Sequence, residues 1–253
     1  MLKDFTKETF DILIQAGQSN SEGYGFGNIE NPYNPNNNVY YLTPDFIIEH
    51  ATERVTGNQI QSNFGLSFAQ EYIDAGMLEE NRKILILRAA VGGTSFTDHR
   101  WGMQDDLYLR MIEMIKTALE LNPANRLVAL LWHQGETDAQ KRATYDMHYN
   151  NLKNLVCSVR EIFDAKKLPF IAGDFVHHWK NNNLDLAVPV VDAIHAVCKE
   201  CQPSAFVESD GLLSNLEELG YNPLGWTDTI HFSRKAIYEL GKRYFNAFVE
   251  ISK

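Results

Sequence analysis

Four short apolar runs, each followed by turn residues, constrain the fold of this chain more than any other feature of its sequence. The runs lie at residues 10–17, 83–93, 126–135 and 169–176. Because they are almost continuously apolar, they predict strands buried on both faces, as in a parallel sheet. Longer segments repeat apolar residues every three or four positions, which predicts amphipathic helices at residues 103–121, 141–165 and 233–252. This alternation predicts an α/β fold, a three-layer αβα sandwich with a mostly parallel central sheet.

Length, composition and charge narrow the class of protein. A chain of 253 residues that is 44% hydrophobic can bury a large core, so we expect a single domain over residues 1–253. Its 33 acidic and 23 basic residues give a net charge of -10. Binding to nucleic acid depends on clustered Lys and Arg, so we expect no nucleic-acid partner. The Asn- and Pro-rich segment 28–38 predicts a surface loop.

The N-terminal segment indicates where in the cell the protein is located, and the cysteines indicate whether it has metal or redox chemistry. Asp4, Lys7 and Glu8 interrupt the stretch where a secretory signal needs an unbroken apolar region, and no later run approaches the length of a membrane span. We therefore expect a cytoplasmic protein without a membrane partner. Cys198 and Cys201 form one C-x-x-C pair, which without a second pair is weak evidence for zinc or redox chemistry. The sequence leaves the oligomeric state open.

Polar residues follow each of the four apolar runs. The four polar clusters lie at residues 17–20, 92–95, 133–136 and 174–179. In parallel sheets covered by helices, ligands bind in the crevice outside the carboxyl ends of the strands. We therefore expect the clusters to lie along one edge of the sheet and to build one site there.

Ser19 stands directly after the first run, where Gly17 allows the backbone to turn sharply and leave the hydroxyl exposed. A serine hydroxyl becomes an effective nucleophile only with a base in reach and a third group that orients this base. Asp228 precedes His231 by three residues, a spacing that lets the carboxylate fold back onto one imidazole nitrogen. Singly, such residues are most often turn or surface residues, so the prediction of a catalytic triad depends on their occurrence together.

Acyl transfer also requires hydrogen-bond donors at the place where the oxyanion develops. Gly92 and Gly93 allow a backbone N–H to approach that place without side-chain obstruction, and the side-chain amide of Gln134 carries two donors. Together with the N–H of Ser19, one glycine and Gln134 predict an oxyanion hole with three donors. In the alternative interpretation the glycines form a plain turn, and Gln134 and Glu136 cap the helix that follows.

Four short motifs occur in a fixed order along the chain: GQSN at 17–20, GGTS at 92–95, WHQGE at 132–136 and DTIHF at 228–232. Together they resemble the carbohydrate acetylesterase branch of the SGNH hydrolases, which includes sialate O-acetylesterases and family-six acetylxylan esterases. The resemblance extends over residues 12–232. It implies the SGNH, flavodoxin-like form of the αβα sandwich.

By this resemblance, Ser19 is the nucleophile, His231 the base and Asp228 the partner of the base. The oxyanion hole is then formed by the N–H of Ser19, one glycine N–H and the amide of Gln134, which stands where the wider superfamily often has Asn. Gly93 is the favoured glycine.

Two assignments stay open at this point. Glu136 belongs to the same motif as Gln134 and is an alternative or additional acid partner of His231, although the Asp-x-x-His spacing favours Asp228. Gly92 is the alternative to Gly93 as the donor to the oxyanion.

The residues and the resemblance together predict a serine esterase that removes O-acetyl groups from a carbohydrate, an acetylated sialic acid or xylo-oligosaccharide, through an acyl-serine intermediate. We expect no cofactor and no metal, and a small acetylated sugar as the partner. One alternative is an SGNH esterase or lipase that acts on a non-carbohydrate ester, and another is a non-catalytic carbohydrate-binding protein on the same fold. Trp101, Trp179 and Trp226 are candidates for stacking on a sugar ring.

Overall fold

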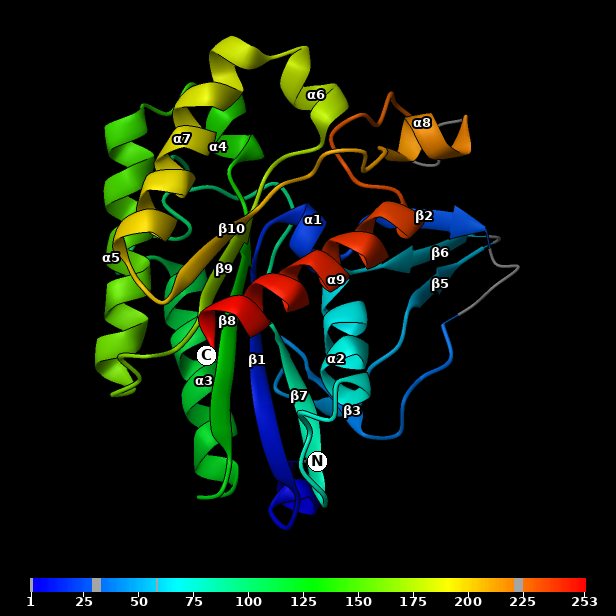
Figure 1. The fold of residues 1–253 in the computed structure, drawn as a ribbon, viewed down its shortest axis with the longest axis vertical. Helices are drawn as coiled ribbons and strands as arrows, with labels where there is room; N and C mark the ends of the chain where they lie inside the picture. Colours follow the sequence, from blue (N-terminus) through cyan, green and yellow to red (C-terminus); the bar gives the residue numbers. More distant parts are fainter. Residues whose placement is uncertain (1, 29–32, 58, 221–224) are drawn as a thin grey trace.

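The computed structural model describes residues 2–28, 33–57, 59–220 and 225–253, and its centre is a seven-stranded sheet (Figure 1). In spatial order the strands are β10 (Ser204–Val207), β9 (Phe170–Gly173), β8 (Arg126–His133), β1 (Thr9–Gly17), β7 (Arg82–Arg88), β3 (Val39–Leu42) and β4 (Ile48–His50). Every neighbouring pair is parallel except β3 and β4. The four apolar runs form β1, β7, β8 and β9, which confirms the prediction of a mostly parallel sheet.

Helices cover both faces of this sheet. In Figure 1, α2 (Phe64–Asp74) and α9 (Arg234–Ile251) lie in front of the sheet and pack together, whereas α3 (Asp106–Leu121) lies behind it. The helices α5 (Tyr145–Ile162) and α7 (Leu184–Glu200) pack against each other beside β9 and β10. The three segments with helical periodicity therefore form α3, α5 and α9, as predicted. Among the described helices, none is both long and apolar enough to cross a bilayer.

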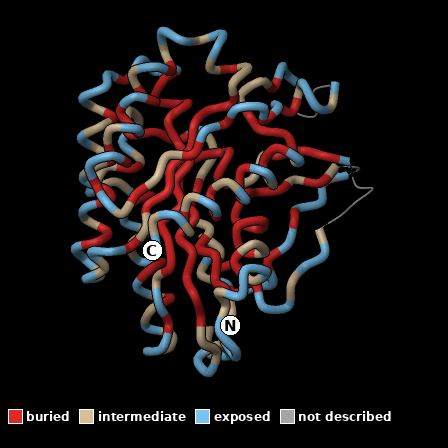
Figure 2. Tube along the Cα trace, viewed as in Figure 1, coloured by how far each residue is buried: buried red, intermediate tan, exposed pale blue. Residues whose placement is uncertain are grey.

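Burial follows from the position of each strand in the sheet. The strand β1 lies between β7 and β8, and Figure 2 shows the central strands buried and the outer faces of the helices exposed. From Phe10 to Gly17 every residue of β1 is buried. Asp11 is the one acidic residue in this strand, and its carboxylate accepts hydrogen bonds from Arg82 and Arg126 at 2.7 Å each. These ion pairs stabilise a buried charge at the edge of the sheet opposite the predicted site.

A second, three-stranded antiparallel sheet and several short helices were not predicted. The sheet consists of β2 (Gly25–Asn28), β6 (Gln59–Ser62) and β5 (Arg54–Thr56). The short helices are the 3-10 helix η1 (Leu2–Phe5) and the α-helices α1 (Ser19–Glu22), α4 (Glu136–Gln140), α6 (His177–Asn181) and α8 (Asn215–Leu219). The predicted surface loop at 28–38 falls partly outside the described residues, at 29–32, and residues 33–38 lie outside helices and strands.

Candidate active site

The turn after β1 presents Ser19 at the carboxyl edge of the sheet. Gly17 ends β1 with a φ angle of 123°, a conformation that favours glycine. A Cβ atom at this position would lie 2.1 Å from the carbonyl oxygen of His133, the last residue of β8, so no side chain fits. The N–H of Gln18 donates to that same carbonyl at 2.9 Å, and α1 begins at the next residue. The close approach of β1 and β8 therefore requires a glycine before the candidate nucleophile.

Ser19, His231 and Asp228 form one hydrogen-bonded chain. Ser19 Oγ lies 2.8 Å from His231 Nε2, and His231 Nδ1 lies 2.9 Å from Asp228 Oδ1. The same carboxylate oxygen accepts a hydrogen bond from the backbone N–H of His231 at 3.2 Å. Ser19 and His231 are 6% and 7% exposed, whereas Asp228 is fully buried. The fold thus brings together, in the geometry of a nucleophile, a base and an orienting acid, three residues that are up to 212 positions apart.

Asn215, which the sequence analysis did not single out, holds the carboxylate of Asp228 in place. Its Nδ2 donates to Asp228 Oδ2 at 2.7 Å and to the carbonyl of Tyr24 at 2.8 Å, and its Oδ1 accepts from the N–H of Phe26 at 2.9 Å. Asn215 is the first residue of α8 and is fully buried. One oxygen of the carboxylate therefore faces His231 while the other is fixed by an amide that is itself fixed by the backbone next to β2.

Glu136, the alternative acid partner, contacts the residue after Ser19. Its Oε1 accepts a hydrogen bond from Asn20 Nδ2 at 2.7 Å, and Asn20 Oδ1 accepts from the N–H of Phe232 at 3.1 Å. Burial by itself raises the pKa of Glu136, but the nearby imidazole of His133, with Nε2 3.6 Å from Glu136 Oε1, and the hydrogen bond from Asn20 outweigh burial and lower this pKa below its usual value. Within the described residues, no hydrogen bond joins Glu136 to His231. Its hydrogen-bonded link to the loop that carries His231 runs through Asn20.

Glu22 distinguishes the two glycines that follow β7. The N–H of Gly92 donates to Glu22 Oε2 at 2.6 Å, so this donor is occupied. In the described part of the chain, the N–H groups of Gly93 and Ser19 have no hydrogen-bond partner. Gly93 has a φ angle of 68°, in the left-handed region that favours glycine. This arrangement leaves Ser19 and Gly93 with backbone donors available to an oxyanion.

Gln134, the third oxyanion donor predicted from the sequence, has its side-chain NH₂ group engaged by other groups in this structure. It is fully buried and is not among the residues that line the pocket at Ser19. Its Nε2 donates to Asp138 Oδ2 at 2.7 Å and to the carbonyl of Thr94 at 3.4 Å. Asp138 Oδ1 in turn accepts from the N–H of Thr97 at 2.9 Å. In this structure Gln134 and Asp138 hold the loop that follows the two glycines.

Asp138 gives this loop a stability that depends on pH. Burial by itself raises the pKa of Asp138, but the nearby imidazole of His148, with Nδ1 3.3 Å from Asp138 Oδ2, and hydrogen bonds from Thr97 and Gln134 hold this pKa at about 2. A carboxyl whose pKa is lower in the folded than in the unfolded chain stabilises the fold above its unfolded pKa, about 4, and loses that contribution as the pH falls towards 2. Asp138→Asn is therefore expected to lower the free energy of unfolding at neutral pH and to flatten its decline between about pH 4 and 2. Urea unfolding at several pH values measures both effects, and parallel curves for variant and wild type would contradict this role.

Gln18 directly precedes Ser19, and its side-chain NH₂ group is free at the pocket. The sequence analysis did not predict a role for this residue. Its Oε1 accepts hydrogen bonds from the N–H groups of Gly135 at 3.3 Å and Thr137 at 3.2 Å. Two backbone donors identify this atom as the oxygen, so the other end of the amide is the NH₂ group. Gln18 is 2% exposed and lines the pocket, and among the described residues its Nε2 has no hydrogen-bond partner. The only sequence signal was the position of an amide beside Ser19.

An open cavity of about 370 Å³ lies above Ser19 and His231. Trp179, from α6, and Trp226, from the loop before Asp228, line it, and Trp226 is 47% exposed. Trp101 is fully buried in the core, so the prediction that it contacts a sugar is wrong. Ser19, His231 and two tryptophan side chains therefore border the same open cavity.

Two proteins with names of carbohydrate esterases are similar to this chain in sequence. A protein of Escherichia coli (strain K12) named "Probable 9-O-acetyl-N-acetylneuraminic acid deacetylase" is 29% identical over 131 residues, which cover 42% of this chain and 39% of that relative. A probable carbohydrate esterase of Arabidopsis thaliana is 27% identical over 180 residues, which cover 63% of this chain and 66% of that protein. The chain thus aligns with less than two thirds of the length of either relative.

Structural and family comparisons cover nearly the whole chain. The crystal structure of NanS superposes with a TM-score of 0.81 at 20% identity, over 96% of this chain and 97% of the other, and so shares its fold. The sequence model of the family described as "Carbohydrate esterase, sialic acid-specific acetylesterase" matches residues 9–250. This match includes the nucleophile turn, the glycine loop and the Asp-x-x-His segment. The chain therefore belongs to the sialic acid-specific acetylesterase family of carbohydrate esterases.

Proposed function

We propose that this protein is a serine esterase that hydrolyses O-acetyl esters of a sugar, an acetylated sialic acid in the first place, through an acyl-serine intermediate. The observation that carries the proposal is the hydrogen-bonded chain of Ser19, His231 and Asp228 beneath an open pocket. Membership of the family and the name of the Escherichia coli relative support the choice of substrate. Trp179 and Trp226 line the pocket and supply aromatic faces suited to a sugar ring.

In the first half of the reaction, Ser19 Oγ attacks the acetyl carbonyl carbon while His231 Nε2 takes the proton of the hydroxyl. The carboxylate of Asp228 stabilises the imidazolium that forms. When the tetrahedral intermediate collapses, the bond between the carbonyl carbon and the sugar oxygen breaks, and His231 returns the proton to that oxygen. The sugar leaves with a free hydroxyl, and the acetyl group stays on Ser19.

In the second half, water takes the place of the sugar. His231 removes a proton from the water, the hydroxide oxygen attacks the acetyl carbon, and collapse restores the Ser19 hydroxyl and releases acetate. In both halves the negative carbonyl oxygen requires donors, and the free N–H groups of Ser19 and Gly93 are the backbone donors we assign to it.

A panel of acetyl esters tests the proposed function. The purified protein is incubated with 9-O-acetyl-N-acetylneuraminic acid, acetylated xylo-oligosaccharides and p-nitrophenyl acetate, and the released acetate or nitrophenol is measured. The highest kcat/KM is expected for the acetylated sialic acid. Turnover of the aryl ester alone would favour an esterase for non-carbohydrate substrates, and turnover of none of the three would favour a non-catalytic binding protein.

Gln18 supplies the third oxyanion donor in this proposal, in place of Gln134. Gln18→Glu keeps the size of the side chain and the acceptor for α4 but replaces the free NH₂ with an oxygen. Loss of one oxyanion donor costs about a hundredfold to a thousandfold in kcat, so a loss of this size is expected with a small change in KM. Steady-state kinetics on the best acetyl ester measure the two parameters separately.

Gln134→Ala is the matched test of the donor predicted from the sequence. Because the Gln134 amide is bonded to Asp138, we expect this variant to lower the free energy of unfolding more than it lowers kcat. A hundredfold loss of kcat in Gln134→Ala, together with near wild-type kcat in Gln18→Glu, would return the oxyanion role to Gln134.

A further inference from the structure

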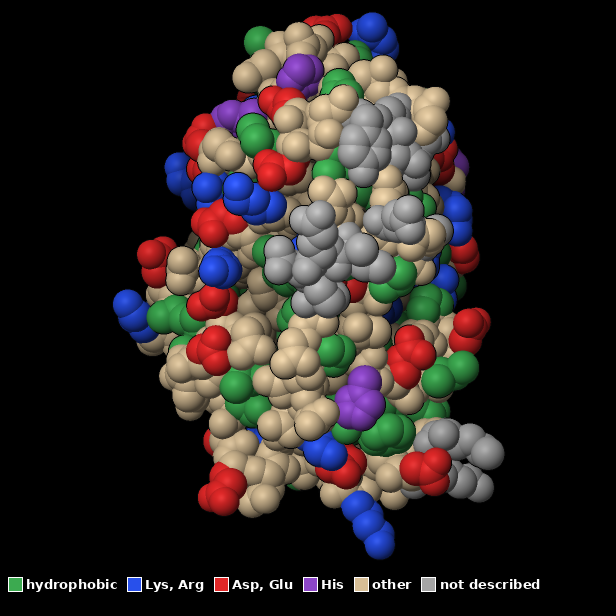
Figure 3. Space-filling model, turned by 90° about the vertical axis from the view of Figure 1, so that its right-hand side faces the viewer, with side chains coloured by type: hydrophobic (Ala, Val, Ile, Leu, Met, Phe, Trp, Pro, Cys, Tyr) green, Lys and Arg blue, Asp and Glu red, His purple; other side chains and the backbone are tan. Residues whose placement is uncertain are grey.

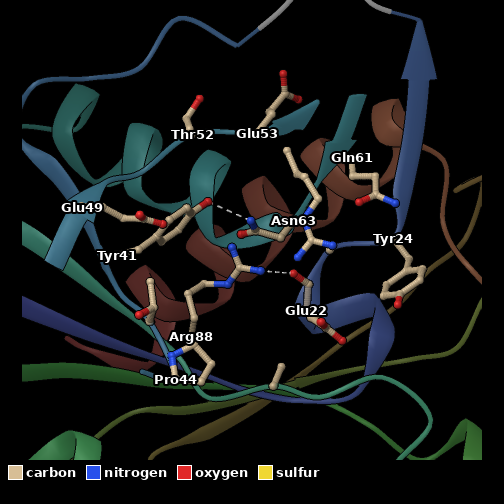
Figure 4. Close-up of a pocket in the computed structure, with 14 residues that line it drawn as sticks. Glu22, Tyr24, Tyr41, Pro44, Glu49, Thr52, Glu53, Gln61, Asn63 and Arg88 are labelled. Atoms are coloured by element: carbon tan, nitrogen blue, oxygen red, sulfur yellow. Dashed lines mark hydrogen bonds between the residues drawn. The ribbon is translucent and has the colours of Figure 1, made fainter. Parts of the chain in front are cut away.

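A second cavity of about 400 Å³, which we call the arginine pocket, adjoins the candidate active site (Figure 4). The residues that define it here are Tyr24, Tyr41, Arg54, Asn63 and Arg88. They come from the segment after α1 and from β3, β5, the start of α2 and the end of β7, which meet above the carboxyl edge of the sheet. None of the four sequence motifs includes these residues, so the family resemblance assigned nothing to them.

The guanidinium group of Arg88 is held in place and lacks an acidic partner. It donates from Nη2 to the backbone carbonyl of Glu22 and lies over the ring of Tyr41, 4.7 Å from the ring centroid. Figure 4 shows this group reaching into the middle of the cavity below Asn63. Within the described residues, neither Arg88 nor Arg54 forms an ion pair. Two arginines without a carboxylate partner therefore border one small cavity.

Three acidic residues also line the cavity: Glu22 and Glu53 are engaged by other groups, and Glu49 is exposed. Glu53 accepts from Arg234 Nε at 2.6 Å and from the Tyr238 hydroxyl at 2.8 Å, and Figure 4 shows its carboxylate turned away from Arg88. The Oε2 atom of Glu22 accepts the N–H of Gly92. Figure 3 shows acidic and basic side chains interspersed over the face on the side of β5 and β6. The attraction for an anion is therefore local to the two guanidinium groups.

Tyr24 connects the arginine pocket to the catalytic residues. It lines both cavities, and its ring stacks on that of His231 with centroids 5.0 Å apart. Glu22, whose carbonyl holds Arg88, lies three residues after Ser19 in α1, a rise of about 5 Å along the helix axis. One sugar can therefore extend past Tyr24 with its acetyl ester at Ser19 and another group in the arginine pocket.

We propose that the arginine pocket binds a carboxylate carried by the sugar whose acetyl group is removed at Ser19, so that the enzyme selects acidic over neutral acetylated sugars. Guanidinium is planar and always charged, and it binds a carboxylate through two parallel hydrogen bonds. Arg88 is the principal contact, because its position is fixed, and the exposed Arg54 is a second one. The inference rests on the proposed esterase function and adds the residues that set its substrate class.

The test compares two substrates that differ only in the charge of one group. These are 9-O-acetyl-N-acetylneuraminic acid and its methyl ester at the C1 carboxyl, with p-nitrophenyl acetate as a third substrate that reports the triad. We expect wild-type kcat/KM to be about tenfold to a hundredfold higher for the acid than for its methyl ester. Arg88→Gln is expected to bring this ratio close to one, mainly by raising KM for the acid, and Arg54→Gln to reduce it partly.

The controls separate charge from packing. Arg243→Gln is the matched variant, because Arg243 also donates to backbone carbonyls, those of Glu208 and Asp210, but lies outside both cavities. It is expected to keep the wild-type ratio. Arg88→Lys retains the charge and is expected to keep a ratio between those of wild type and Arg88→Gln. If circular dichroism shows that Arg88→Gln is unfolded, the ratios measured for the wild type and for Arg54→Gln test whether the arginine pocket binds the carboxylate.

Two different failures can be told apart. Equal wild-type kcat/KM for the acid and its methyl ester, with clear turnover of both, would overturn the arginine pocket and leave the esterase function standing. No turnover of any of the three substrates would overturn the esterase function. Salt gives an independent check, because the preference for the acid is expected to shrink as ionic strength rises, and a ratio insensitive to salt would contradict a charge-based origin.

Discussion

Ser19→Ala is expected to abolish the hydrolysis of acetyl esters while the protein remains folded. The hydroxyl of Ser19 has one hydrogen-bond partner in the described structure, His231, and its removal deletes the atom that forms the acyl intermediate. Loss of such a nucleophile costs about a millionfold in kcat in a comparable hydrolase. Initial rates on the best acetyl ester measure the loss, and circular dichroism and thermal unfolding show whether the fold is kept.

Ser21→Ala is the matched control for this change. Ser21 lies in the same helix, α1, and its buried hydroxyl has no hydrogen-bond partner among the described residues. We expect it to keep near wild-type rates. Combining Ser19→Ala with His231→Ala is expected to cost little more than Ser19→Ala alone, because the two residues act as one unit. A folded Ser19→Ala protein with a tenth of wild-type activity would remove Ser19 from the mechanism.

Asp228→Asn is expected to lower kcat by about ten thousandfold. The asparagine keeps the shape of the side chain but presents an NH₂ group to an imidazole nitrogen that must itself donate, so the wrong tautomer of His231 is stabilised. The backbone N–H of His231 also loses its acceptor, because it donates to the same oxygen of Asp228. Initial rates on the best acetyl ester measure the loss, and circular dichroism shows whether the fold is kept.

Glu136→Gln is the comparison that decides between the two acids. It keeps an acceptor for Asn20, and among the described residues no hydrogen bond joins Glu136 to His231, so the loss of kcat is expected to be much smaller than in Asp228→Asn. If Glu136→Gln is the more damaging variant at matched stability, Asp228 cannot be the sole acid partner.

Local sequence patterns predicted the central strands, the helices α3, α5 and α9 and the turns that end at the site, but not α2 and α7. An apolar run such as that of β1 has few ways to bury all its residues except between two other strands, so its place in the sheet follows from its composition. The edge strands β3, β4 and β10 and the sheet of β2, β5 and β6 are three or four residues long, and such segments are too short to show a periodicity that differs from a loop.

The order of the central strands along the chain, the glycine before Ser19 and the residue types that could form a triad can all be read from the sequence. Which polar side chains face the pocket, and which are buried behind it, depends on the tertiary structure. Gln134 and Gln18 carry the same amide, yet the first donates to Asp138 and the second leaves its NH₂ group free at the pocket. The reason is physical: a side-chain hydrogen bond depends on partners brought close by folding, such as α4 beside the nucleophile turn, and the spacing of residues along the chain does not encode that proximity.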